Sequence, residues 1–125
     1  MEIQWFSKNI NGVVSIYETN ITLNTVASIH FEGAYKTIIG FNKADSTLII
    51  KKLTKEEVMS GAYNNFDLHD VSIKPSYGRI NGKDLVKNIV KHFPLDFTNT
   101  TLHKFNCSWD DTTKSLTIYL KGGVI

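Results

Sequence analysis

Lys83, Lys87 and Lys91 recur at every fourth position of the segment GKDLVKNIVKHF. Side chains four residues apart lie on one face of an α-helix. The segment is predicted to be a helix because its apolar residues, among them Leu85 and Ile89, repeat on another face. A row of ammonium groups binds phosphates, and each phosphate that it neutralises makes binding more sensitive to salt. The spacing therefore indicates a surface for DNA.

Two further cations come shortly before this helix. Lys74 and Arg79 lie in a segment that is predicted to be a strand, and there they can extend the lysine row. An arginine can also donate two hydrogen bonds to a guanine edge. The predicted DNA-binding residues are Lys74, Arg79, Lys83, Lys87 and Lys91. An alternative stays open, because the solvent face of an amphipathic helix is commonly rich in lysine for solubility alone.

The sequence contains no arrangement of residues that is typical of catalysis. Cys107 has no partner cysteine and lies in a strand-like segment, so we expect a structural thiol. The histidines have no spacing typical of metal ligands. They are His30, His69, His92 and His103. We therefore predict a protein that is not an enzyme, with no catalytic residues, no metal and no cofactor.

Composition and charge limit the possible partners. The chain has 125 residues, of which 42% are hydrophobic and 21% charged, so it can form one folded core. Its net charge of +2 indicates nucleic-acid binding only if the basic residues gather locally. The single cysteine excludes an intrachain disulfide and favours a reducing, cytoplasmic location. The start MEIQWFSKN is unlike a signal peptide, and no apolar run is long enough to predict a membrane span.

The first half of the chain predicts strands separated by two short helices. Asn24 is expected to cap the first helix, over residues 25–31. Thr54 and Glu57 have the spacing of a capping box at the start of the second helix. Strands are predicted over residues 3–7, 13–23, 34–42 and 46–53.

The second half predicts a strand, a longer helix and a hairpin. The strand covers residues 71–80, and Pro75 places it at a sheet edge or bends it. Asn81 is expected to cap the helix, with Asp84 completing a capping box. Pro94 ends the helix. The closing hairpin is predicted over residues 102–110 and 114–121.

Two hairpin segments of the chain are alike. FNKADSTLIIKKL and WDDTTKSLTIYLK share a leading aromatic residue, a polar turn and a Leu-x-Ile strand, and each follows a strand and a helix. We therefore predict two similar strand–helix–hairpin units, residues 1–60 and 71–125, joined by a polar linker at 61–70 and sharing one core. The alternative is that two hairpins with the same turn chemistry resemble each other by chance.

The segment YGRINGKDLVKNIV, followed by LHKFNCSWDDTTKSLTIYLK, resembles the AbrB-like swapped-hairpin family of bacterial transition-state regulators. Gly78 and Arg79 match the Gly-Arg pair of that family, whereas Asn81 and Gly82 stand where the family has Ile/Val-Pro. The resemblance implies an α+β, β-rich fold in which two units pack as one swapped-hairpin barrel with pseudo-two-fold symmetry. It also implies DNA binding and transcription regulation.

A different function stays open beside DNA binding. The first helix segment, TVASIHF, contains no lysine, and the first half has no Gly-Arg pair. A non-enzymatic interaction or scaffold protein of the same fold, which does not bind DNA, fits these features. Its partner is then another protein or a second copy of the chain. A monomer is expected if the two units complete one barrel, and a homodimer if each unit needs a second copy.

Overall fold

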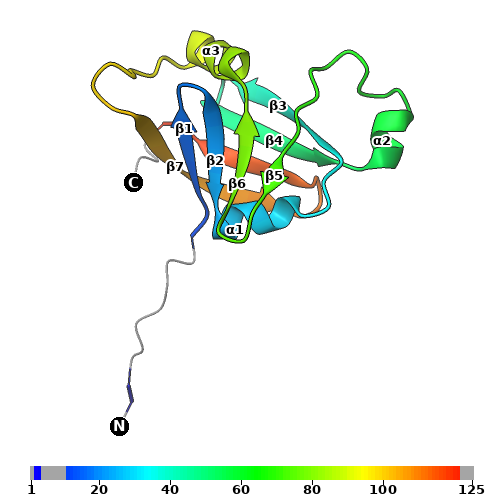
Figure 1. Ribbon diagram of the computed structural model, residues 1–125, viewed down its shortest axis with the longest axis horizontal. Helices are drawn as coiled ribbons and strands as arrows, with labels where there is room; N and C mark the ends of the chain where they lie inside the picture. Colours follow the sequence, from blue (N-terminus) through cyan, green and yellow to red (C-terminus); the bar gives the residue numbers. More distant parts are fainter. Residues whose placement is uncertain (1, 4–10, 122–125) are drawn as a thin grey trace.

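Strands predominate in the computed structural model, which describes residues 2–3 and 11–121 (Figure 1). The strands are β1 (Val13–Tyr17), β2 (Asn20–Asn24), β3 (Lys36–Asn42), β4 (Thr47–Leu53), β5 (Ser72–Ile73), β6 (Tyr77–Asn81), β7 (Leu102–Asp110) and β8 (Ser115–Tyr119). The helices are α1 (Thr25–Ser28), the 3-10 helix η1 (Ile29–Phe31), α2 (Lys55–Met59) and α3 (Lys83–His92). The prediction of a β-rich α+β fold is confirmed.

All eight strands belong to one antiparallel sheet, in the order β3-β4-β8-β7-β1-β2-β6-β5. The sheet curls into a half-barrel, so that its two ends approach each other (Figure 1). Thr37 of β3 forms an isolated antiparallel bridge with His69, three residues before β5 begins. This bridge is a seam between the two ends of the sheet.

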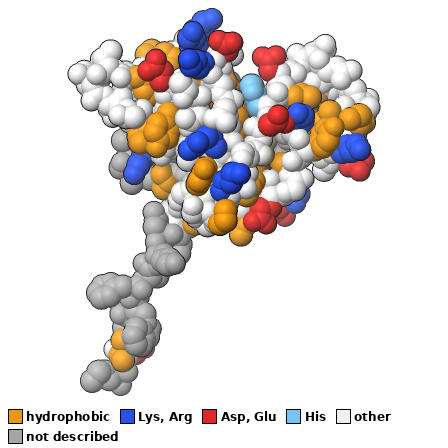
Figure 2. Space-filling model, in the orientation of Figure 1, with side chains coloured by type: hydrophobic (Ala, Val, Ile, Leu, Met, Phe, Trp, Pro, Cys, Tyr) orange, Lys and Arg blue, Asp and Glu red, His pale blue; other side chains and the backbone are white. Residues whose placement is uncertain are grey.

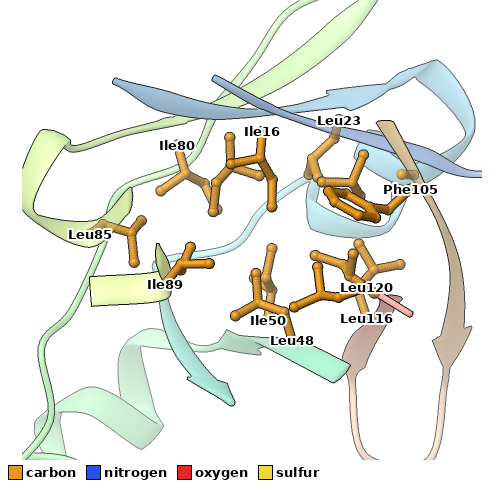
Figure 3. Packing of buried hydrophobic residues seen from close by; sticks show 14 of the residues in the cluster. Ile16, Leu23, Leu48, Ile50, Ile80, Leu85, Ile89, Phe105, Leu116 and Leu120 are labelled. Carbon is orange, nitrogen blue, oxygen red and sulfur yellow. The ribbon is translucent and has the colours of Figure 1, made fainter. Parts of the chain in front are cut away.

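Side chains from facing walls of the curled sheet meet in one core (Figure 3). Ile16 of β1 and Ile80 of β6 lie across the interior from Ile50 of β4, and all three are fully buried. Leu85 and Ile89 of α3 enter the same core. Helices α1 and α3 lie at opposite ends of the half-barrel (Figure 1). Helix α3 is therefore anchored by its apolar face, and its polar face is left for solvent or a partner.

The segment predicted as one strand over residues 13–23 is instead the hairpin β1–β2. Its chain reverses at Glu18 and Thr19, and Ile16 pairs with Ile21. The burial pattern explains the correction, because the buried positions are even-numbered in β1 and odd-numbered in β2. Side chains alternate between faces along a continuous strand, so this change of phase requires a turn.

The segment predicted as one strand over residues 71–80 is also a hairpin, β5–β6. Pro75 lies in its turn, where the Lys74 N–H donates to the Tyr77 carbonyl over 2.8 Å. Proline has a fixed φ and no N–H, so it suits a turn better than a ladder position. Of the two predicted effects of Pro75, the chain does bend there, whereas only β5 lies at the sheet edge and β6 lies inside the sheet.

Asn81 does not cap α3, and the predicted capping box with Asp84 is wrong. Asn81 is the last residue of β6 and pairs with Asn20, so its backbone is committed to the sheet. The N-cap is Gly82, which has no side chain to donate or accept, and its N–H bonds to the Thr19 carbonyl over 2.9 Å.

The caps predicted for the two shorter helices are confirmed. The Asn24 side-chain oxygen accepts a hydrogen bond from the Ala27 N–H over 3.0 Å, and it also accepts from the Val13 N–H over 3.1 Å. Thr54 and Glu57 form the reciprocal capping box of α2. Asn24 thus joins the start of β1 to the start of α1.

The two similar hairpin segments have the same turn geometry. In the β3–β4 turn the Asn42 side chain accepts from the Ala44 N–H, and in the β7–β8 turn Asp110 accepts from the Thr112 N–H. The residue before the second strand has a positive φ in each turn, 52° at Ser46 and 54° at Lys114. The likeness seen in the sequence therefore extends to backbone conformation.

The strand predicted over residues 3–7 lies, from residue 4 onward, outside the described residues. In the part of the chain that the structure describes, none of the helices has the length and apolar character needed to cross a membrane.

Candidate binding surface around helix α3

The three lysines of α3 lie on its solvent side. Lys83, Lys87 and Lys91 are exposed, whereas Leu85 and Ile89 on the opposite side are buried. This is the placement that the four-residue spacing predicts. With a rise of about 1.5 Å per residue, neighbouring lysines of the row begin about 6 Å apart along the helix axis.

Lys74 and Arg79 lie apart from this row. Lys74 lies in the β5–β6 turn, next to the first residue of β6, whereas α3 follows the last residue of β6. Arg79 is half-buried in β6, with its guanidinium carbon 5.1 Å from the centre of the Tyr77 ring. Lys and Arg side chains on the face drawn in Figure 2 form separate groups with hydrophobic and acidic side chains between them. The structure therefore brings together three of the five predicted DNA-binding residues and leaves Lys74 at the far end of β6.

None of these five cations has an ion pair within the described residues. The ion pairs found there are Lys36–Asp70 and Lys114–Asp111. The Nε atom of Arg79 is buried and has no hydrogen-bond partner among the described residues. The lysine charges of α3 are therefore available to a ligand.

A groove of about 760 Å³ lies between β3, α3 and residues 65–69, and we call it the β3–α3 groove. Its apolar lining includes Ile39 and Leu85. Its charged lining has both signs and consists of Asp67, Asp84, Lys87 and Lys91. In Figure 2 the upper outline of the molecule is notched between α3 and the segment that follows α2. The groove thus combines an apolar floor with a charged rim.

The edge of β3 that borders this groove carries unpaired backbone groups. Thr37 directs its N–H and C=O away from β4, because both bond to His69. In an antiparallel pair the outward direction recurs at every second residue, so Ile39 and Phe41 also direct their N–H and C=O away from β4. Within residues 11–121, no donor or acceptor bonds to these four groups. The edge is thus closed at Thr37 and open beyond it.

A smaller crevice of about 130 Å³, lined by apolar side chains and also by Asn88 and His92, continues the groove beneath the open edge. Phe41 and Leu48 line it from the sheet, and Leu85 and Ile89 line it from α3. The rings of Phe41 and His92 lie 5.3 Å apart, which brings β3 close to the end of α3. The crevice offers an apolar site next to free backbone donors and acceptors.

A second groove, of about 900 Å³, lies on the other side of α3 and faces residues 95–98. Lys83, Lys87 and Lys91 all line it, and Val90 and Phe97 contribute apolar surface. Two of the lysines, Lys87 and Lys91, line both grooves, whereas Lys83 lines only this one. The difference makes Lys83 a useful control position.

The described residues contain no group of three or more His, Cys, Asp or Glu side chains that could hold a metal ion. The half-buried Cys107 has its pKa raised to about 11 by burial, so its thiol is protonated at neutral pH. His30 stacks on Trp109 with ring centres 4.7 Å apart and planes 8° from parallel. A packed, protonated thiol and a stacked imidazole are typical of structural roles.

Family models, curated proteins and solved structures give no match to this chain. The proposals below therefore depend on the geometry of the chain itself.

The open edge of β3 was not predicted from the sequence. The segment KTIIGFN was recognised as a strand and paired with the next strand, but which of its edges stays free depends on where residues 61–70 run. The one local signal is Gly40, because glycine inside a strand is typical of a bulge or of close backbone approach.

Proposed function

We propose that this protein is a non-enzymatic interaction protein that binds another protein in the β3–α3 groove. The observation that carries the proposal is the combination of an apolar floor, a charged rim and the open edge of β3 in one concave surface. Protein interfaces have this organisation, with an apolar centre surrounded by polar residues.

The charges of the groove favour a protein over a nucleic acid. Asp67 and Asp84 face the same space as Lys87 and Lys91, so the rim carries as many negative as positive side chains. Phosphates are repelled by the carboxylates, whereas a polypeptide can present both signs of charge.

Strand pairing supports the proposal that the chain is a tandem duplication. In the β2–β6 pair, Asn20 lies opposite Asn81, and Asn24 lies opposite Tyr77. Tyr77 comes 57 positions after Asn20, and Asn81 comes 57 positions after Asn24, so exchanging the two units turns each pair into the other. Any two fully paired antiparallel strands of equal length have this property, so the support comes from the choice of partner: β2 pairs with its own counterpart β6, as strands beside a two-fold axis do.

The β4–β8 pair has the same property with a different shift. Thr47 lies opposite Tyr119, and Lys51 lies opposite Ser115. Ser115 comes 68 positions after Thr47, and Tyr119 comes 68 positions after Lys51. The longer helix and loop of the second unit account for the larger shift. Each hairpin pairs with a strand of the other unit, which supports the resemblance to swapped-hairpin proteins. Two units that complete one barrel predict a monomer, which light scattering at micromolar concentration tests.

In this arrangement β3 and β7 are counterparts, and their outer edges differ. β1 pairs with β7 over five residue pairs, from Val13 with Asn106 to Tyr17 with Leu102. Among the described residues, the outer edge of β3 pairs only at the Thr37 bridge. The proposed binding groove therefore lies beside a strand edge at which the two units differ.

A peptide-display selection tests the proposed function. The wild-type protein is the bait for a random-peptide library, and each enriched peptide is then titrated against two variants. Asn88→Trp places a large side chain in the groove from an exposed position of α3, whereas Lys83→Trp places it on the side that does not line the groove. We expect binding to weaken roughly tenfold, about 1.4 kcal/mol, in Asn88→Trp and to persist in Lys83→Trp. Failure to enrich any peptide, or equal binding by both variants, overturns the proposal.

DNA binding is the second candidate, and the unpaired lysine row of α3 favours it. Three lysines on one helix face can neutralise about three phosphates, so affinity should fall steeply with salt. Fluorescence anisotropy with a random 20-base-pair duplex, titrated from low to physiological salt, measures this dependence. The triple variant Lys83/Lys87/Lys91→Glu should lose the binding, and no binding by the wild type at low salt removes this candidate.

A further inference from the structure

We infer that the β3–α3 groove takes an extended peptide strand of the partner, which pairs antiparallel with the open edge of β3 and presents aliphatic side chains at alternate positions. The inference rests on the proposed function and names the form in which the partner binds.

The backbone of β3 specifies this form. The N–H and C=O groups of Ile39 and Phe41 are four donors and acceptors with the spacing of a sheet ladder. They lie at the groove and at the crevice that continues it, without a protein partner among the described residues. An exposed strand edge is a template for another strand, and strand addition is a common mode of peptide recognition. His69 already pairs with this edge at Thr37 in the antiparallel direction. An added strand that is antiparallel to β3 therefore runs in the same direction as the chain at His69.

The position of the edge favours a single strand over a second copy of the chain. The edge lies between α3 on one side and residues 65–69 on the other, since both line the groove beside it. In an edge-to-edge dimer each copy would bring its own α3 and its own 65–69 segment into the space of the other. A single peptide strand brings no such elements with it, so it can lie in the groove beside the edge.

The two faces of the added strand meet different surroundings. Residues opposite Ile39 and Phe41 point to the core side, where the crevice of about 130 Å³ is lined by Leu85 and Ile89. A cavity of about 150 Å³ holds a benzene molecule, so this crevice accepts one side chain of the size of leucine or isoleucine. The residue of the added strand that lies between these two positions is opposite Gly40. Gly40 has no side chain, and the space beside it is open. An aromatic side chain on a neighbouring strand covers such a glycine well.

The probe that follows from this pattern is the fluorescein-labelled peptide acetyl-Ser-Val-Tyr-Leu-Thr-Glu-amide. Two isomers carry N-methyl groups, either on its Val and Leu or on its Tyr and Thr. If Val and Leu lie opposite Ile39 and Phe41, the first isomer loses the N–H groups that face β3, whereas the second loses only N–H groups that face away. Two lost hydrogen bonds should weaken binding roughly tenfold or more, measured by fluorescence anisotropy.

A matched pair of protein variants tests the same contact from the other side. Ile39→Pro removes an N–H that points away from β4, so the β3–β4 ladder keeps its own hydrogen bonds. Ile39→Val keeps the N–H and is the control. We expect the proline variant to bind the unmethylated peptide roughly tenfold more weakly than the valine variant. Thermal unfolding of both variants shows whether the proline variant is folded. If it is not, the methylated peptides still test the same contact on the wild-type protein.

The outcomes separate the inference from the proposed function. Equal affinity of the two methylated isomers, or no binding of the unmethylated peptide up to about 1 mM, overturns strand addition. The proposed function then stands if display peptides still bind the wild type and bind Asn88→Trp more weakly than Lys83→Trp. It falls with the inference if the display selection enriches no peptide.

Discussion

Thr37 and His69 exchange two backbone hydrogen bonds of 2.8 Å each, and this pair is the seam of the curled sheet. Thr37 is fully buried, and its hydroxyl also donates to the His69 carbonyl over 3.0 Å. Residues 61–70 were predicted as a linker between units, and through this pair they also carry a structural contact. The same contact determines where the open edge of β3 begins.

We expect His69→Pro to destabilise the protein by about 1–3 kcal/mol, because it removes the N–H that bonds to the buried Thr37. His69→Ala keeps the backbone and is the matched control. Urea denaturation followed by circular dichroism gives the free energy of unfolding of both variants. If the two are equally stable, the hydrogen bond that the His69 N–H donates makes no net contribution to the free energy of unfolding.

The sequence predicted elements well where the signal is local. Asn24, Thr54 and Glu57 were assigned as caps from their chemistry alone, and their hydrogen bonds are present. Asn81 has the same chemistry but belongs to a strand, because its backbone pairs with Asn20. At Asn81 the pairing between strands outweighs the local preference for a helix cap. Neither a cap motif nor a residue propensity predicts that pairing.

The candidate site was predicted in part for the same reason. The α3 lysines follow from helical spacing, whereas the position of Lys74 depends on the chain reversal at Pro75. A continuous strand was expected there, and the hairpin instead carries Lys74 to the far end of β6. The open edge at Ile39 and Phe41 arises from contacts between segments far apart in the sequence, which no local pattern predicts.

The positive φ angles of Ser46 and Lys114 predict matched effects in the two hairpin turns. A β-branched residue is strained in this region, whereas glycine adopts it freely. We expect Ser46→Val to be about 1–2 kcal/mol less stable than Ser46→Gly, with the same difference at Lys114. Ala44, which has no positive φ, is the control position, where the valine variant should not be the less stable one. Unequal differences at Ser46 and Lys114 in urea denaturation would contradict the equivalence of the turns.

Gly12 and Cys107 should be coupled energetically. A Cβ atom at Gly12 would lie 2.8 Å from the Cys107 sulfur, which is far inside van der Waals contact. We expect Gly12→Ala to cost about 1–3 kcal/mol in the wild type and less in a Cys107→Ala background. A double-mutant cycle measures the coupling. Additive effects would show that the two residues do not compete for the same space.

Two histidines predict a loss of stability in mild acid. Partial burial holds the pKa of His69 below its ordinary value against the opposing carboxylates of Asp67 and Asp70, and it also lowers the pKa of His30. The unfolded chain therefore binds more protons than the folded chain below about pH 6.5, so the free energy of unfolding falls as the pH decreases through this range. The double variant His30→Gln/His69→Gln should flatten the fall between about pH 6.5 and 5.

Acidic groups affect the stability of the protein in a separate and lower pH range. Hydrogen bonds from the Thr98 hydroxyl and backbone lower the pKa of Asp96, and its contribution to stability is lost only as the pH falls below the ordinary value of 3.8. Melting temperatures measured from pH 7 to 3 distinguish the two windows. The histidine variant should match the wild type in its loss below about pH 4. An unchanged slope above pH 5 would show that neither imidazole resists protonation in the folded protein.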